Sequence, residues 1–409
     1  MESARQICII DNERNASVIG DFLQANGCAV ARCTSCGAEC RQEGRHPDAI
    51  LLNGDDLSDG RGALEAIRNR EHLFQVPLIV YGARGERARM VKLLQRGATD
   101  YLNAPLLKAE LLEKIRVHTR TQALLRSFSR FVPEVYLRMM KKKDLANVAL
   151  GDFAVVPLSV LFTDVRSYTE LSEKLAPQDI FRFLNSLFSR MEPVIKRNHG
   201  FVDKYIGDAI LALFPGPTDD CLDAGLNMMS ELRRYNEHRA SSGYPPVQMG
   251  LGMHQGDVAL GTIGSDDRLN ATVIGDPVNL ASRVETLTKV FGADLILTDS
   301  ISRQLARPGR YNLREIDTVR VKGKQTPIVL YEAFDINPSE LIEKKKMMMG
   351  DYERALSLYK QGSFQPAMDL FTACKDFCPE DKIPDIYIRR CNSLIRIPPG
   401  KDWAGISTL

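Results

Sequence analysis

The chain has no apolar run near the ~20 residues that a transmembrane helix needs. It also lacks a strong charge of one sign, because 54 Lys and Arg residues against 52 Asp and Glu residues leave a formal net charge of +2. That balance argues against a dominant role in binding nucleic acid or a membrane surface. The first residues, Met1–Gln6, lead straight into an apolar stretch and form no secretory h-region. We therefore expect a cytoplasmic protein that neither inserts into a membrane nor binds nucleic acid.

Cysteine is present without the spacing of a small secreted framework, so the nine cysteines are expected as reduced thiols. One group is denser than the rest, since Cys33, Cys36 and Cys40 follow each other closely and Cys28 lies nearby. Such a group can bind a metal ion or sense redox state. The flanking residues instead favour a strand and a helix with partly buried thiols. The sequence leaves both interpretations open.

A chain of 409 residues with 44% apolar content predicts two or three globular domains. Residues 1–120 alternate short apolar runs with amphipathic stretches, which predicts a parallel sheet covered by helices on both faces. The runs are Ile7–Ile10, Ala49–Leu52, Leu78–Tyr81 and Tyr101–Leu102, with a weaker one at Cys28–Ala31. With Gly97–Leu102 and Pro105, this segment resembles a bacterial response-regulator receiver domain. The resemblance implies a flavodoxin-like fold.

The chemistry of a receiver is missing from this segment. The resemblance places Asn53 where the family phosphorylates an aspartate, Ala104 where it has a lysine, and Gly82 where it has a hydroxyl residue. An amide cannot form an acyl phosphate. We therefore interpret the segment as a pseudo-receiver, used for interaction or for sensing something else. A surrogate acceptor at Asp55 or Asp56 is the alternative.

Residues 121–150 are expected to form a helical linker between the pseudo-receiver and the next domain. The helical pattern runs over residues 106–145, and Pro133 interrupts it. Two interpretations of this helix remain. It pairs in parallel with the same helix of a second chain, or it is a plain solvated linker.

Residues 337–409 are expected to form a short helical tail. Ala355–Tyr359 and Ala367–Phe371 flank a turn at Gln361–Phe364, an arrangement that resembles one tetratricopeptide-like helix pair. A single pair cannot bury its own apolar face, so it must dock on something. Either this tail or the pseudo-receiver could hold a protein partner. Residues 398–409 look irregular.

Two aspartates point to a metal site. Asp164 lies in the apolar run Leu161–Val165, and Asp208 follows Gly207, so each lies beside a short run typical of a buried strand. A lone buried carboxylate is costly without a positive partner. Two carboxylates, with Gly207 allowing close backbone approach, favour a shared divalent cation. The alternative is that both aspartates are surface turn residues.

A second constellation, Thr272–Arg283, follows downstream. Together with the two aspartate segments it resembles the class III nucleotide cyclase family over about residues 155–334. We assign a catalytic domain with a ferredoxin-like α+β fold to residues 151–336. Such enzymes convert a nucleoside triphosphate into a 3′,5′-cyclic nucleotide and pyrophosphate. The resemblance implies two Mg²⁺ or Mn²⁺ ions per site, held by Asp164, Asp208 and the Val165 carbonyl.

The resemblance also gives roles to three more polar residues. Asn279 and Arg283 lie four residues apart on a predicted helix, which places both side chains on one helix face. The family uses the asparagine to orient the ribose and the arginine to stabilise the transition state. Lys322 matches a phosphate-contacting lysine, although Lys324 competes for that role. The alternative for these cations is an ordinary surface ion pair.

Lys204 and Thr272 are predicted to read the base. A lysine that donates to N1 and a hydroxyl that accepts from N6 select adenine, whereas guanine reverses that edge and needs a carboxylate in place of the lysine. This pair resembles the threonine-type subclass of adenylate cyclases, which is associated with bicarbonate stimulation. ATP is therefore the expected substrate, and bicarbonate is an expected activator.

The family places its metal aspartates opposite the base-reading and transition-state residues of a partner chain. This chain holds both sets of residues and one cyclase domain, which implies a homodimer with two composite sites. We therefore expect an adenylate cyclase regulated by its pseudo-receiver. Two alternatives remain. One is a catalytically silent nucleotide-binding scaffold, since the pseudo-receiver shows that part of the chain can lose its chemistry. The other is a guanylate cyclase, which Lys204 opposes.

Overall fold

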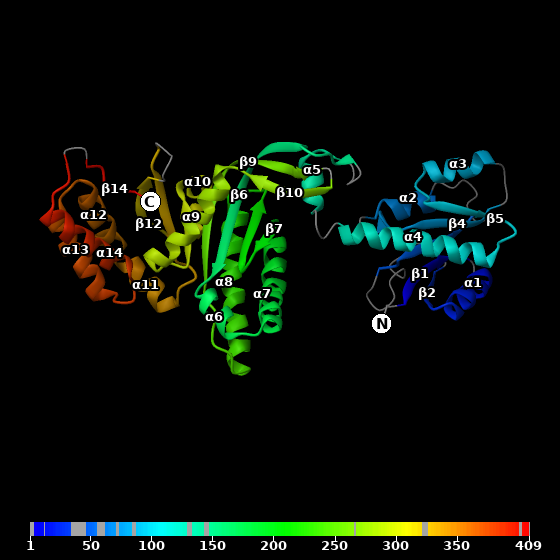
Figure 1. Ribbon diagram of the computed structural model, residues 1–409, viewed down its shortest axis with the longest axis horizontal. Coiled ribbons are helices and arrows are strands. Elements are labelled where there is room, and N and C mark those ends of the chain that lie inside the picture. The colour runs from blue at the N-terminus through cyan, green and yellow to red at the C-terminus, as the bar shows by residue number, and fades with distance from the viewer. Residues whose placement is uncertain are drawn as a thin grey trace. The chain divides into compact units, whose positions relative to one another are not determined.

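The computed structural model describes residues 4–11, 13–33, 46–54, 62–70, 73–83, 87–128, 133–142, 147–265, 267–320, 326–400 and 403–408. The chain divides into two compact units, Met1–Val132 and Pro133–Leu409 (Figure 1). Helices long and apolar enough to cross a membrane are absent from the part of the chain that the structure describes.

The first unit is built on a parallel five-stranded sheet. Its strands are β1 (Arg5–Ile10), β2 (Cys28–Cys33), β3 (Ala49–Asn53), β4 (Leu78–Ala83) and β5 (Asp100–Asn103). They lie in the order β2-β1-β3-β4-β5, which is the strand order of flavodoxin-like doubly wound folds. Every apolar run predicted from the sequence forms one of these strands, including the weaker run at Cys28–Ala31. The prediction of a parallel sheet is therefore confirmed.

Helices cover both faces of this sheet. They are α1 (Glu13–Ala25), α2 (Gly62–Arg68), α3 (Arg87–Gln95) and α4 (Lys108–Phe128). Side chains of α1 and α4 pack with one set of strand residues, and side chains of α2 and α3 pack with the other set. A strand buried on both faces needs an uninterrupted apolar run, and all five residues of β3 are buried.

The helix predicted over residues 106–145 is divided in two. Helix α4 ends at Phe128, and α5 (Glu134–Met139) starts directly after Pro133, the residue at which the sequence predicted an interruption. Tyr136 of α5 is fully buried in the second unit, where its ring packs edge-on against Phe201 at a centroid distance of 5.7 Å. The short helix is thus anchored on the second unit.

The second unit contains a nine-stranded mixed sheet. Its strands are β6 (Phe153–Val165), β7 (Phe201–Ile206), β8 (Ala209–Phe214), β9 (Met249–Ser265), β10 (Arg268–Ile274), β11 (Leu295–Thr298), β12 (Leu313–Arg320), β13 (Ile328–Ala333) and β14 (Ile406–Thr408). The order is β14-β12-β13-β11-β9-β6-β8-β7, with β10 paired to β9. Most neighbours are antiparallel, but β11 runs parallel to β9 and β14 runs parallel to β12.

Helices cover this sheet on both faces. They are α6 (Tyr168–Lys174), α7 (Pro177–Arg197), α8 (Thr218–Ser241), α9 (Asp276–Phe291) and α10 (Asp299–Ser302), followed by the four tail helices α11 (Ser339–Met347), α12 (Met349–Lys360), α13 (Phe364–Phe377) and α14 (Ile383–Arg396). One core joins α7 and α8 to the sheet, and the other joins α9 and the tail helices to it. Alternating residues of β11 supply both cores, since Leu295 and Leu297 face the first and Ile296 faces the second.

The tail is more than one helix pair. Helices α12 and α13 form the pair that the sequence predicted, and α14 packs beside α13, where the rings of Phe371 and Tyr387 stack at 4.7 Å. The Tyr387 hydroxyl donates to the Ile316 carbonyl of β12 at 2.8 Å. Side chains of α12, α13 and α14 also share a core with β11, β12 and β13, so the tail docks on the sheet of its own chain. The prediction of an irregular end was wrong for Ile406–Thr408, which add strand β14 beside β12.

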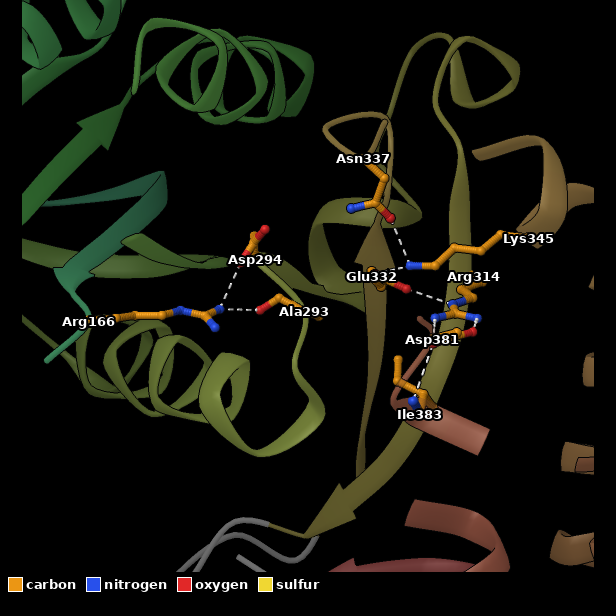
Figure 2. Close-up of polar contacts among 9 residues, drawn as sticks. All are labelled: Arg166, Ala293, Asp294, Arg314, Glu332, Asn337, Lys345, Asp381 and Ile383. Carbon is orange, nitrogen blue, oxygen red and sulfur yellow. Dashed lines mark hydrogen bonds and ion pairs between the residues drawn. The ribbon is translucent and has the colours of Figure 1, made fainter. Parts of the chain in front are cut away.

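A buried ion-pair cluster fixes the tail to the sheet (Figure 2). Arg314 of β12 contacts Glu332 of β13 at 2.6 Å and Asp381, just before α14, at 2.5 and 2.8 Å. Lys345 of α11 donates to the other oxygen of Glu332 and to Asn337, at 2.8 Å each. The four charged residues are at most 6% exposed. Loss of one member would leave an uncompensated buried charge, so the cluster makes the tail part of the second unit.

Candidate active site

Asp164 and Asp208 meet at one end of the sheet in the second unit. Strands β6 and β8 are antiparallel neighbours with Thr163 opposite Ile210, so the residues that flank these positions lie close together. Gly207, at φ +63°, forms the turn that places Asp208 between β7 and β8. The Val165 N–H donates to Asp208 Oδ2 at 3.2 Å. The pairing predicted from the sequence is therefore present in the structure.

The two carboxyl groups act on each other electrostatically. Burial raises the pKa of Asp208 to about 7, and a hydrogen bond that the protonated Asp208 donates to Asp164, together with the negative charge of Asp164, adds to the rise. Two carboxylates this close cannot both ionise without a compensating positive charge. A divalent cation would supply that charge, so this donor set fits Mg²⁺ or Mn²⁺.

The site contains few protein ligands for a metal ion. Within the described residues, no three His, Cys, Asp or Glu side chains form a metal-binding group. Mg²⁺ is commonly held by one or two carboxylates plus substrate phosphates and water, rather than by an all-protein cage. Two aspartates and the Val165 carbonyl fit that mode of binding, in which the nucleotide completes the coordination shell.

Helix α9 borders the site and lies directly on β9. Pro277 stands in its first turn, and Gly292 ends it in the left-handed conformation at φ +63°. Gly252 of β9 permits this close approach, because a Cβ there would lie 2.1 Å from the backbone nitrogen of Glu285. The helix thereby brings Lys289 to Asp164, and the Lys289 Nζ lies 3.2 Å from Asp164 Oδ2.

Glu285 is a third carboxyl group beside the aspartate pair. The residue is 3% exposed, and burial followed by the charge of Asp164 raises its pKa to about 7. Its Oε1 atom is buried and has no hydrogen-bond partner among the residues that the structure describes. Neither Glu285 nor Lys289 was predicted as a site residue. Both lie on the helix that carries Asn279 and Arg283, but on a different side of it from Arg283, so same-face spacing from Arg283 does not point to them.

Lys204 and Thr272 are brought together from two separate strands. The Lys204 ammonium on β7 donates to the Thr272 hydroxyl on β10. Strand β10 pairs with β9, which lies beside β6, and β7 joins β6 through β8, so Lys204, Thr272 and Asp164 belong to one sheet. The two residues predicted to read the base therefore contact each other, and their role stays a prediction.

Asp203 and Tyr136 support Lys204, and the sequence predicted neither. The side chain of Asp203 is fully buried, and its Oδ2 lies 3.2 Å from the Lys204 Nζ. The Tyr136 hydroxyl of α5 donates to Asp203 Oδ1. Burial raises the pKa of Asp203 to about 6, and the adjacent Lys204 opposes that rise. A chain of contacts therefore runs from Tyr136 through Asp203 and Lys204 to Thr272.

Asn279 and Arg283 lie on an exposed face of α9. Hydrogen bonds or ion pairs from them to Asp164 or Asp208 are absent from the described part of the chain. Arg283 precedes Lys289 by six residues, which separates them by about 9 Å along the helix axis and turns them toward different sides. Within the described part of one chain, Asn279 and Arg283 therefore do not lie on the aspartate pair. Lys322 and Lys324 lie outside the described residues.

The first unit has a different polar cluster where a receiver has its phosphorylation site. Asn53 ends β3, and its side-chain amide donates to Asp11 Oδ1 at 2.8 Å. The Tyr81 hydroxyl donates to Asp11 Oδ2 at 2.5 Å. Gly82 has φ +75°, and a Cβ there would lie 3.3 Å from the Asn53 side-chain oxygen. The Asp11 carboxylate is thus held by neighbouring side chains of its own sheet.

Other residues predicted for the first unit lie partly outside the described residues. Cys28 and Cys33 are buried, whereas Cys36, Cys40, Asp55 and Asp56 lie outside the residues that the structure describes. A metal site built from this cysteine group and a phosphate acceptor at Asp55 or Asp56 therefore stay predictions.

Comparison with known proteins agrees with this geometry. Residues 154–332 match the family described as the adenylate and guanylate cyclase catalytic domain. An adenylate cyclase of Anabaena cylindrica is 42% identical over 212 residues, which cover 50% of this chain and 42% of that protein. A terminal-differentiation-specific adenylate cyclase of Dictyostelium discoideum is 31% identical over 280 residues, covering 66% of this chain and 13% of that protein. The chain thus spans less than half the length of these curated relatives.

A solved structure shows the same fold at lower sequence identity. It belongs to a bacterial light-regulated adenylyl cyclase, with a TM-score of 0.50, 20% identity, and coverage of 63% of this chain and 81% of that one. At this identity the likeness shows the fold alone. The family match over residues 154–332 lies within this second unit.

Proposed function

We propose that the chain is an adenylate cyclase, which converts ATP into 3′,5′-cyclic AMP and pyrophosphate. In this reaction the ribose 3′-oxygen attacks the α-phosphorus of the same nucleotide. The nucleophile is already tethered, so the protein has to position the triphosphate and neutralise developing charge. The paired aspartates at the end of β6 and the β7–β8 turn carry this proposal, supported by the cyclase match over residues 154–332.

Asp164, Asp208 and the Val165 carbonyl would hold two Mg²⁺ or Mn²⁺ ions. Ions bound there would reduce the electrostatic repulsion that opposes attack of the ribose 3′-oxygen on the α-phosphorus, and they would stabilise the leaving pyrophosphate. The protein itself holds the two aspartates in place through the Val165–Asp208 hydrogen bond and the Gly207 turn. The raised pKa of Asp208 supports the assignment, because it marks a carboxyl group whose ionisation needs a nearby cation.

Lys204 and Thr272 would select adenine. A lysine can donate to N1 but cannot accept a hydrogen bond, and the threonine hydroxyl can accept from N6. The contact between the two side chains supports a joint role. Asp203 forms an ion pair with the lysine, and Tyr136 donates to Asp203, which fits a positioning role for both.

Asn279 and Arg283 would act on a nucleotide held by the aspartates of a second chain. Their separation from Asp164 within one chain supports this composite arrangement. An exposed apolar surface supports it as well, because Phe153 is 68% exposed, Val155 62% and Ile274 53%. Val155 and Ile274 are both in register with Ala259 of β9, so these side chains share one sheet face. Exposed patches of this kind often mark interfaces, and the proposed assembly is a homodimer with two sites.

The first unit would act as a regulatory module without phosphorylation. Its sheet order fits a receiver-like fold. Asp11 is engaged by Asn53 and Tyr81, which supports a pocket that does not carry receiver chemistry. Regulation would then depend on contacts or a bound ligand. The proposal has further parts. Bicarbonate would activate the enzyme, and Lys322 would contact phosphate. The tail or the first unit would bind a protein partner, and the protein would be cytoplasmic.

A nucleotide assay tests this proposal. Purified full-length protein is incubated with Mn²⁺ and either ATP or GTP, and the cyclic product is identified by mass spectrometry. Adenylate cyclase activity predicts cyclic AMP from ATP and little product from GTP. Cyclic GMP as the main product would replace the proposal with a guanylate cyclase. Nucleotide binding without any cyclic product would support the scaffold alternative.

A further inference from the structure

Lys289 contacts the proposed metal site but has no part in the chemistry described above. Its ammonium lies 3.2 Å from Asp164 Oδ2, and the two side chains are 46% and 27% exposed. The ion pair therefore lies where solvent and ions can reach it. A divalent cation on Asp164 would share this carboxylate with the ammonium or displace it, because like charges at such short range repel each other.

Glu285 offers the same lysine a second carboxylate. Glu285 precedes Lys289 by four residues on α9, and a glutamate placed four residues before a lysine is the favourable order for an ion pair on a helix. Its Oε1 is buried and lacks a hydrogen-bond partner among the described residues. A buried carboxylate oxygen in that situation is costly, and a contact with the ammonium would remove the cost.

Gly250 explains how the glutamate reaches this position. It is the register partner of Asp164 on β9, and a Cβ there would come within 2.7 Å of Glu285 Oε1. The missing side chain therefore makes room for Glu285 beside Asp164. The other cation near Glu285 is Arg166, which is held by the Ala293 carbonyl and by Asp294, at 2.9 Å each (Figure 2). Of these two cations Lys289 is the more exposed, and its ion pair within the described residues is with Asp164.

We propose that Lys289 is a movable counter-ion of the metal site, with one position on Asp164 and a second on Glu285. When a divalent cation binds Asp164, the ammonium turns back by one helical turn to Glu285. Lys289 thereby competes with the metal ion, and Glu285 weakens that competition by accepting the displaced lysine. The pair sets the metal concentration at which the site fills. This inference rests on the proposed metal site at Asp164 and Asp208.

Direct Mn²⁺ binding to the full chain tests the inference without measuring turnover. The free Mn²⁺ signal is followed by electron paramagnetic resonance as protein is titrated in the absence of nucleotide. Lys289→Gln should bind Mn²⁺ roughly two- to five-fold more tightly, the scale of one exposed ion pair. Lys289→Arg, which keeps the charge, should stay near the wild-type affinity. Lys346→Gln, which breaks an exposed ion pair on α11 with Glu343, is the matched control and should change nothing.

The double variant separates the movable lysine from a simple charge effect. Glu285→Gln should weaken Mn²⁺ binding about two- to five-fold, since the displaced lysine loses its second position. In the Lys289→Gln background the same substitution should have no effect. If Glu285→Gln weakens binding equally in both backgrounds, the glutamate acts only through its negative charge and the inference is overturned.

Two further outcomes keep this inference distinct from the proposed function. If Asp164→Ala leaves Mn²⁺ binding at the wild-type level, the proposed metal site itself is wrong. If Asp164→Ala abolishes binding but Lys289→Gln and Lys289→Arg match the wild type, the metal site stands and the movable lysine is rejected. The two Lys289 variants change an exposed side chain, so they keep the test decisive even if Glu285→Gln fails to fold.

Discussion

The Tyr136 hydroxyl donates a hydrogen bond to Asp203, which lies 67 residues later in the sequence. This bond connects α5, the first helix of the second unit, to the residue that pairs with Lys204, the proposed base-reading lysine. Asp203 is also in ion contact with Lys204, whose ammonium donates to Thr272. Tyr136 and Asp203 do not have to touch the nucleotide to matter. They fix the direction of a flexible lysine, and a donor that is already oriented loses less entropy when the base binds.

Removal of the Tyr136 hydroxyl should weaken the use of ATP without abolishing the reaction. Tyr136→Phe keeps the ring against Phe201 and deletes only the hydrogen bond to Asp203. We expect KM for ATP to rise about three- to ten-fold, the scale of the net contribution of one typical hydrogen bond, with kcat changed less. Steady-state kinetics of cyclic AMP formation check this. An unchanged KM in a folded variant would remove Tyr136 from the positioning chain.

Substitution of both base-reading residues should lower the preference for ATP. In Lys204→Glu with Thr272→Cys, the glutamate can no longer donate to N1 of adenine, so the site leaves a buried polar group unpaired against ATP. We expect kcat/KM for ATP to fall by about 10²-fold or more and the ratio of GTP to ATP use to rise. Competition between the two nucleotides measures this ratio. A well-folded double variant that keeps its ATP preference would show that these residues do not read the base.

Phosphoryl donors should not change the first unit or the cyclase rate. Asn53 cannot form an acyl phosphate, and Asp11 is already held by Asn53 and Tyr81. Acetyl phosphate and beryllofluoride should therefore leave protein mass, oligomeric state and cyclic AMP production unchanged. A mass increase of one phosphate on this unit, accompanied by a new cyclase rate, would contradict the pseudo-receiver interpretation and direct attention to Asp55 or Asp56.

Disruption of the buried ion-pair cluster that fixes the tail to the sheet should destabilise the second unit. Arg314→Met leaves Glu332 and Asp381 buried with less compensating charge, which should cost about 3–5 kcal/mol of unfolding free energy. Trp403 is the only tryptophan in the chain, and it packs on the tail ring of Tyr359, so its fluorescence follows the loss of this region in urea. Arg303→Met, at an exposed ion pair with Asp299, is the control and should cost less than about 1 kcal/mol. Equal effects of the two variants would show that the buried cluster does not stabilise the unit.

Local patterns predicted those parts of the molecule whose structure depends on neighbouring residues. The continuous apolar runs of the first unit predicted its strands, because a strand buried on both faces must be apolar throughout. Gly207 and the apolar runs beside Asp164 and Asp208 predicted that two carboxylates lie near each other. The helix interruption predicted at Pro133 also follows from the backbone restriction of proline itself.

Contacts between distant, ordinary-looking residues could not be predicted in this way. Asp203 looks like a polar residue of an edge strand, and only the packing of Tyr136 shows that it is buried. Arg314 and Asp381 likewise resemble surface charges until α14 covers them. The strand at Ile406–Thr408 depends on an open edge of β12, which no local pattern reveals. Pairings of this kind depend on the completed fold.

The central claim is that one active site is assembled from two chains. Asp164→Ala should be inactive, because it removes a proposed metal ligand. Arg283→Ala should lose about 10²–10³ in rate, the usual scale for one transition-state donor. The two substitutions damage different halves of each composite site, so a heterodimer of the two variants keeps one intact site.

The most direct test is to mix the two inactive variants and measure cyclic AMP. Differently tagged chains are co-purified so that heterodimer formation is established independently of activity. The account predicts that the heterodimer regains activity, up to about half of the wild-type rate per dimer, because one of its two sites is whole. A purified heterodimer that stays as inactive as its parent variants would contradict the composite site.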